Sequence, residues 1–129
     1  MLAGMKGNYG PQKPALSVWT FSDPRDGLVQ LVVQSAHRPH RSRYEQPGSN
    51  AIKAAWFWEL RRLRLRPIVQ CIGRCADLWA ANKTWQSEVL RLGMIGQARL
   101  NFVGNTLQAE DLRERLQADK QAVDRSNSA

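Results

Sequence analysis

The segment from residue 51 to residue 67, AIKAAWFWELRRLRLRP, constrains the fold more than any other stretch of the sequence. Projected on a helix at roughly 100° per residue, its apolar side chains form two stripes on nearly opposite sides. The first stripe consists of Ile52, Trp56, Leu60 and Leu63, and the second of Ala54, Trp58 and Leu65. A helix with two apolar faces packs one face on its own core and the other on something external. We therefore expect a helix that runs to Arg66 and ends at Pro67, with Trp58 and Leu65 facing a partner.

Two apolar runs precede this helix, at residues 15–21 and 28–34, and the residues between them are SDPRDG. Asp23 followed by a proline suits the first two positions of a type I turn, and Gly27 suits the left-handed residue that closes it. Apolar residues alternate with glutamine in the second run, which is the period of a half-buried strand. The pattern predicts a β-hairpin. Because an isolated hairpin is marginal in water, we expect it to pack on the helices or on something else.

Three further helices are expected after this segment, at Ile68–Ala81, Thr84–Val103 and Leu107–Val123. Gly93 and Gly96 lie one turn apart in the second of these, where small residues let another helix approach closely; a simple bend is the alternative. The last helix combines a narrow apolar line with many charged side chains. That pattern is typical of a solvated terminal helix that packs lightly on a bundle or on another chain.

Together these elements predict a mainly α fold, with an extended N-terminal arm and a β-hairpin followed by a three- to four-helix bundle. The length of 129 residues lies within the usual range of a single domain. Along the chain we expect three parts. Residues 1–49 hold the arm, the hairpin and a basic linker, residues 50–124 form the helical domain, and residues 125–129 are a polar tail.

The charge of the chain indicates which classes of partner it can attract. There are 19 Lys and Arg residues against 11 Asp and Glu residues, a formal net charge of +8. Residues 51–104 hold nine of the basic and three of the acidic side chains, so the positive field is centred on the expected helices. Such a field attracts nucleic acid, anionic lipid or an acidic protein surface without discriminating among them. The plainer alternative is a solvated face that only keeps the protein soluble.

Six arginines are the predicted nucleic-acid contacts, because guanidinium groups bind phosphate through paired N–H donors. Three of them have no acidic neighbour three or four residues away in the helix, and the linker before the helix supplies the other three. The predicted set is Arg38, Arg41, Arg43, Arg61, Arg64 and Arg66. Two other interpretations of the helix stay open. It is either a central helix with arginines that reach out to solvent, or a helix that lies in a lipid headgroup layer.

Cys71 and Cys75, together with His37 and His40, suggest a zinc site by their spacing. Against this, both cysteines lie with Trp79 on an apolar stripe of the helix expected at Ile68–Ala81. A free cysteine on such a stripe behaves as a small apolar residue. The histidines have arginines as close neighbours, which is a poor environment for a cation. We therefore expect no metal, no cofactor and reduced cysteines in a reducing compartment.

The inventory of catalytic side chains is short. The only two histidines lie in the linker, and neither a nucleophile elbow nor a Gly-rich phosphate loop is present. The acids Glu59 and Asp77 are widely spaced, and they leave a metal-dependent nuclease as the third and weakest hypothesis. We therefore predict that the protein is not an enzyme.

The sequence favours a non-catalytic basic protein that docks on nucleic acid, RNA above all, within a larger assembly that includes other protein subunits. The alternative is a protein-binding accessory subunit of a multisubunit complex, for example a mitochondrial one, whose charge meets acidic protein surfaces. The first 14 residues lack the apolar core of a signal peptide, and no apolar run of about 18 residues predicts a transmembrane segment. We expect an intracellular protein of the cytoplasm or the mitochondrial matrix.

Overall fold

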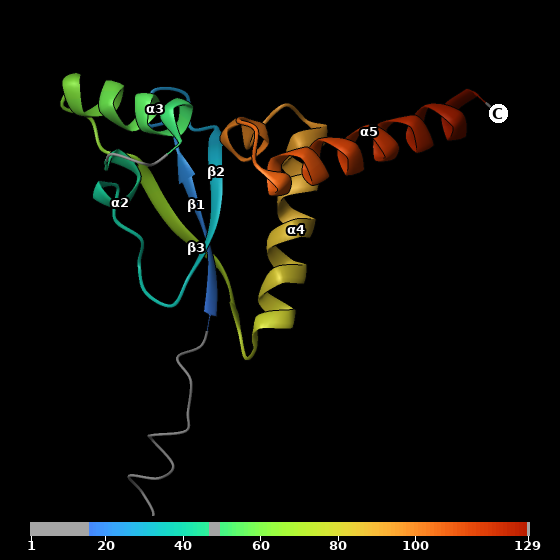
Figure 1. The fold of residues 1–129 in the computed structure, drawn as a ribbon, viewed down its shortest axis with the longest axis horizontal. Helices are drawn as coiled ribbons and strands as arrows, with labels where there is room; N and C mark the ends of the chain where they lie inside the picture. The colour runs from blue at the N-terminus through green and yellow to red at the C-terminus, as the bar shows by residue number, and fades with distance from the viewer. Residues whose placement is uncertain (1–15, 47–49, 129) are drawn as a thin grey trace, which may run out of the picture.

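The computed structural model describes residues 16–46 and 50–128, which form a mixed α/β structure. A three-stranded antiparallel sheet of order β2-β1-β3 lies in the middle, with α2 and α3 on one side and α4 on the other (Figure 1). In chain order the elements are β1 (Leu16–Ser22), β2 (Val29–Ser35), α2 (Ser42–Glu45), α3 (Ala51–Arg62), β3 (Ile68–Cys75), α4 (Leu78–Met94), the 3-10 helix η1 (Arg99–Phe102) and α5 (Leu107–Ser128). The prediction of a mainly α fold with a helix bundle is therefore wrong. The expected N-terminal arm lies outside the described residues.

Strands β1 and β2 form the predicted hairpin, in a register that places Phe21 opposite Leu31. The connecting turn is closed by the N–H of Gly27, which donates to the carbonyl oxygen of Asp23 at 2.7 Å. Gly27 has a φ of +76°, a left-handed conformation that glycine adopts without strain from a Cβ atom. The hairpin was predictable because its turn chemistry is local.

The helix expected at Ile68–Ala81 is wrong, because Ile68–Cys75 forms strand β3 instead. This strand is rich in β-branched residues and pairs antiparallel with β1, which thereby becomes the central strand of the sheet. A short apolar run is compatible with a helix and with a strand, and periodicity alone does not separate the two. The free edge of β1 decided the outcome, and that edge lies about 50 residues away in the sequence.

A β-bulge in β3 separates the two cysteines. Val18 pairs with Gly73 and Trp19 with Cys71, so one residue of β3 has no partner in β1. The bulge places Cys71 on the α3 side of the sheet, where it is exposed, and Cys75 on the α4 side, where it is buried. The helical stripe expected to hold both cysteines therefore does not exist.

Helix α3 ends at Arg62 and does not reach Arg66 as expected. Arg64 has a φ of +60°, and the N–H of Leu65 donates to the carbonyl oxygen of Leu60 at 2.8 Å. A left-handed residue followed by such a backward hydrogen bond is a common way for a helix to end. Leu65 and Arg66 therefore lie in the loop that leads into β3.

The hydrophobic core has two parts, one on each face of the sheet. The part under α4 consists of Val18, Val32, Trp85, Val89, Leu92, Ala98 and Leu112. The part under α3 consists of Phe21, Leu31, Trp56, Phe57, Leu60 and Leu100. The stripe of α3 that was expected to face the core is therefore correct for Trp56 and Leu60. It is wrong for Ile52 and Leu63, which are 51% and 45% exposed.

Close packing between α4, η1 and α5 explains one of the two glycines. Gly93 lies in the last turn of α4, where a Cβ atom would collide with the ring of Phe102 and crowd Leu116. The expected close approach of another element is thus confirmed at Gly93. Gly96 lies beyond the end of α4 with a φ of +78° and serves the turn instead.

Helix α5 is attached to the body only by its first half. Ala109 and Leu112 are buried and Leu116 is half-buried, whereas residues 117–127 are all exposed. Figure 1 shows this second half projecting away from the rest of the molecule. The helix continues into the segment that was expected to be a polar tail.

Candidate functional site

Four of the six predicted arginines line one cleft of about 330 Å³, next to α2 and the start of β3. We call it the arginine cleft, and its polar lining consists of Arg38, His40, Arg41, Ser42, Arg61 and Arg66. Phe21, Val69 and two prolines complete its walls. Arg43 and Arg64 are not part of this lining. The fold therefore brings the linker and the end of α3 together at one place, although about 20 residues separate them.

A buried carboxylate contacts two of these arginines and forms a hydrogen bond with one of them, Arg61. Glu45 of α2 is 9% exposed, and its Oε2 lies 2.8 Å from Nη1 of Arg61. Its Oε1 lies 3.5 Å from Nε of Arg41, whose Nη1 also donates to the carbonyl oxygen of Leu65 at 3.1 Å. Arg61 therefore has an acidic partner, which comes from α2 and not from its own helix. Helical spacing could not have revealed this pair.

The other two arginines of the cleft are free for a ligand. Among the described residues, Arg38 makes one long hydrogen bond of 3.5 Å, to the carbonyl oxygen of Val69. Arg66 has neither a hydrogen bond nor an ion pair within residues 16–46 and 50–128. Glu45 is the one carboxylate in contact with the cleft arginines in this part of the chain, so the cleft keeps an excess of positive charge.

His40 has a defined tautomer in its neutral form. The backbone N–H of Ser42 donates to His40 Nδ1 at 3.1 Å, and the Ser42 hydroxyl lies 2.9 Å from the same atom. Because Nδ1 accepts, the proton of the neutral ring is on Nε2. His40 therefore lines the arginine cleft with its Nδ1 already bonded to Ser42.

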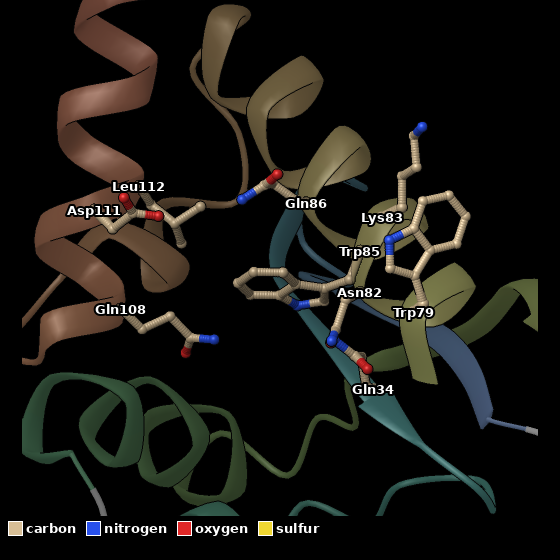
Figure 2. A pocket seen from close by; sticks show the side chains of 9 residues that line it. All are labelled: Gln34, Trp79, Asn82, Lys83, Trp85, Gln86, Gln108, Asp111 and Leu112. Atoms are coloured by element: carbon tan, nitrogen blue, oxygen red, sulfur yellow. The ribbon is translucent and has the colours of Figure 1, made fainter. Parts of the chain in front are cut away.

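A second depression lies between α4 and the beginning of α5, and sequence reasoning missed it. It has a volume of about 540 Å³, and the indole of Trp85 forms its floor (Figure 2). We call it the amide groove, because four carboxamide side chains line it. Its full lining consists of Gln34, Trp79, Asn82, Lys83, Trp85, Gln86, Gln108, Asp111 and Leu112.

Trp79 is the most conspicuous residue of the amide groove. Its side chain is 70% exposed, and the Nζ of Lys83 lies 5.0 Å from its ring centroid. Trp79 was expected on the apolar stripe of a helix at Ile68–Ala81, and that helix does not form. Asp77 was the available signal, because its Oδ1 accepts from the N–H of Ala80 at 2.8 Å and starts α4 there. A helix from that cap places residues 79, 82, 83 and 86 on one face.

The amide groove is held firmly at its base. The Nε1 of Trp85 donates to the carbonyl oxygen of Val32 at 2.8 Å. Asn101 accepts from the N–H of Val32 and donates to the same carbonyl, both at 2.8 Å. These bonds close the outer edge of β2 with side chains, so the groove has a rigid wall at this edge.

A smaller cavity of about 190 Å³ adjoins the amide groove, because both are lined by Gln34, Trp85 and Gln108. Tyr44 and Lys53 lie at its far end. Burial lowers the pKa of Lys53 from its ordinary value, and no acidic side chain of the described residues pairs with it. Helix α2 lines the arginine cleft through Ser42 and this smaller cavity through Tyr44.

The two residues predicted to face a partner do not share a face. Trp58 is 51% exposed, its Nε1 donates to the carbonyl oxygen of Glu45 at 3.3 Å, and the guanidinium of Arg61 lies 5.3 Å from its ring centroid. Leu65 is half-buried against the core under α3. Trp58 therefore offers an accessible surface, whereas Leu65 is mainly a packing residue.

The residues considered for metal and catalysis are dispersed. No group of three or more His, Cys, Asp or Glu that could hold a metal lies in the described part of the chain, and Cys71 and Cys75 form no disulfide. Glu59 pairs with Arg25 at 2.9 Å, whereas Asp77 caps α4. Among the described residues, the helices are too short or too polar to cross a membrane.

Comparison of this chain with protein-family models, with curated proteins and with solved structures gives no match.

Proposed function

We propose that this protein is a non-catalytic component that docks on nucleic acid, RNA in particular, through the arginine cleft, as part of a larger assembly. The observation that carries the proposal is the convergence of Arg38, Arg41, Arg61 and Arg66 on one cleft. A guanidinium group presents a planar fork of donors that matches phosphate oxygens. In this proposal the protein resides in the cytoplasm or the mitochondrial matrix.

The arrangement supports binding to a phosphate backbone more than a role in solubility. Arg61 is hydrogen-bonded to Glu45 and Arg41 to the carbonyl oxygen of Leu65, so little side-chain freedom is lost when they meet a phosphate. Arg38 and Arg66 have no acidic partner within the described residues and supply the attraction. Surface arginines that only aid solubility need neither a shared cleft nor a buried carboxylate to orient them.

The test is the salt dependence of RNA binding by Arg38→Gln/Arg66→Gln. These two arginines are chosen because neither contacts the buried Glu45, whose charge would otherwise be left unpaired. Each phosphate contact to single-stranded RNA contributes about 0.7 to the slope of log affinity against log salt, so the variant should lose about 1.4. The loss of affinity should be similar for unrelated RNA sequences, since phosphate contacts carry no sequence information.

The matched control is Arg62→Gln/Arg74→Gln, which removes the same charge from two exposed arginines outside the arginine cleft. It should change the slope much less than the cleft variant does. An equal change in both variants would mean that net charge alone attracts RNA. An unchanged slope in the cleft variant would remove the cleft from RNA binding.

Exposed apolar side chains favour the second candidate function, a protein-binding accessory subunit of a multisubunit complex. Trp58 is 51% exposed on α3, and Ile68 and Ile72 are 43% and 39% exposed on β3, an edge strand of the sheet. Apolar groups at a sheet edge are typical of surfaces that another chain covers. Sedimentation of the isolated chain tests this. Self-association that salt does not reverse, together with weak RNA binding, would favour the subunit over the RNA-docking protein.

A further inference from the structure

We propose that the amide groove binds a nucleotide, whose base stacks on Trp79 and whose phosphate lies at a lysine of the groove. This inference rests on the proposed RNA docking and adds to it a site that contacts bases. The lining of the arginine cleft contains guanidinium groups that can bind phosphate but no exposed aromatic ring. The amide groove contains a ring together with neutral hydrogen-bonding groups.

The stacking surface is the indole of Trp79. Trp79 is 70% exposed, and the Nζ of Lys83 lies 5.0 Å from its ring centroid, so most of the residue is open to solvent beside one cation (Figure 2). Trp85 cannot serve in this way, because it is 9% exposed and its N–H is bonded to Val32. Flat aromatic side chains bind unpaired bases by stacking, whatever the base.

The carboxamides supply both donors and acceptors for the edge of a base. Gln34 donates to Asn82 Oδ1 at 2.7 Å, which leaves the acceptor of Gln34 and the N–H donors of Asn82 available. Arg115 donates to Gln86 Oε1 at 3.3 Å, which leaves the amide donors of Gln86. Gln108 has no hydrogen bond within the described residues, so both its donor and its acceptor are free.

The charge of the groove selects an anionic ligand. Lys83 lies at the Trp79 end, and Lys53 lies in the adjoining cavity without an acidic partner in the described part of the chain. The one carboxylate of the lining, Asp111, is already paired with Arg115 at 2.9 Å. A neutral sugar would also stack on a tryptophan and bond to amides, but it would leave Lys83 without a counter-charge. A nucleotide satisfies the ring, the amides and Lys83 together.

The decisive experiment compares two oligonucleotides with the same backbone, a ten-nucleotide oligoadenylate and its abasic equivalent, by fluorescence anisotropy with the full chain. Stacking on one aromatic ring predicts that the wild type prefers the oligoadenylate by about 10-fold. Trp79→Ala should abolish that preference without weakening binding of the abasic chain. Trp79→Phe should retain part of it. The control Leu78→Ala removes a side chain that is 60% exposed, adjacent in α4 and outside the groove, and should keep the full preference.

A second measurement locates the ligand and separates its sources. AMP, inorganic phosphate and maltotriose are each titrated while the side-chain amide signals of Asn82, Gln86 and Gln108 are followed by NMR. Shifts caused by AMP but not by phosphate support the site and show that a free nucleotide suffices. A Trp79-dependent preference for oligoadenylate without AMP binding also supports it and identifies an RNA segment as the ligand. Shifts caused by maltotriose alone would overturn the nucleotide in favour of a sugar.

The two proposals fail in different ways. The variant Arg38→Gln/Arg66→Gln should weaken binding of the oligoadenylate and of the abasic chain by the same factor and leave their ratio unchanged. Equal binding of both oligonucleotides by the wild type would overturn the nucleotide site while leaving the arginine cleft intact. An unchanged salt slope in the arginine variant, with a preserved Trp79 effect, would overturn the cleft and leave the groove.

Discussion

Replacing Asp23 by asparagine should lower the free energy of unfolding by about 2–3 kcal/mol at neutral pH. The carboxylate of Asp23 is 5% exposed and joins the hairpin turn to α3. It accepts from Nη2 of Arg25 at 2.7 Å and from Nε of Arg25 at 2.9 Å, and the indole N–H of Trp56 donates to it at 3.1 Å. Asparagine keeps one acceptor oxygen but presents an amide to the guanidinium. One charge-assisted bond is therefore lost, and a bond of this kind contributes about 1.5–3 kcal/mol.

The pH dependence gives the effect a second signature. Hydrogen bonds from Arg25 hold the pKa of Asp23 well below its ordinary value of 3.8. Because the pKa is lower in the folded state, the unfolded chain takes up the proton first as the pH falls. The stabilisation by Asp23 is therefore fully present above about pH 4 and is lost as the pH falls through the folded-state pKa. The difference in stability between wild type and Asp23→Asn should shrink over the same range.

Urea unfolding followed by far-UV circular dichroism, at several pH values from about 7 down to about 3, measures both signatures. The control is Asp26→Asn, which removes the same charge from the same turn. Asp26 makes no ion pair within the described residues, and its side chain only accepts the N–H of Leu28 at 2.9 Å. This control should lie within about 0.5 kcal/mol of the wild type. Parallel stability curves for wild type and Asp23→Asn across the whole pH range would refute the role of the Asp23 charge.

Four further substitutions test the packing. Gly104→Ala should lower the free energy of unfolding in urea by about 2–3 kcal/mol, because Gly104 has a φ of +91° and a Cβ would collide with Asn50, which caps α3. A loss under about 0.5 kcal/mol would contradict this. Arg64→Gly should raise the melting temperature, with a gain of about 1 kcal/mol, because Arg64 has a φ of +60°; a lower melting temperature would disprove the strain. Trp56→Ala should lower the free energy of unfolding by about 3–5 kcal/mol and Trp58→Ala by under about 1 kcal/mol, because the two residues are 7% and 51% exposed. Equal losses would show that α3 is buried on all sides.

The part of the fold that sequence predicted is the part that local chemistry determines. The hairpin depends on a five-residue turn with Asp23 at its start and Gly27 at its end, and both act within the turn. Strand β3 depends on a partner strand about 50 residues earlier. Its sequence, IVQCIGRC, satisfies a helical stripe as well as a strand until that partner is known. The error at β3 then moved the start of α4 and hid the exposed position of Trp79.

The arginine cleft was predicted in its members but not in its geometry. Three arginines were predicted because they lack acidic neighbours in their helix and three because they lie in the adjoining linker, and the fold gathers four of these six. Arg64 is not among these four. It follows the end of α3, where its left-handed backbone turns the chain. The pair between Arg61 and Glu45 joins α3 to a helix of four residues, which has no periodicity to detect.

That short helix, α2, explains why a segment that reads as a basic linker forms part of a cleft. The ring of Tyr44 stacks on Phe57 at 5.2 Å and meets Phe21 edge-on at 5.5 Å, while the neighbouring Glu45 is buried between Arg41 and Arg61. One aromatic ring and one carboxylate thus fix the linker to α3 and to the sheet. The arginines themselves only repel one another, so their convergence requires this anchor. The positive cleft is therefore a consequence of the packing around α2, and the arginine pattern alone does not create it.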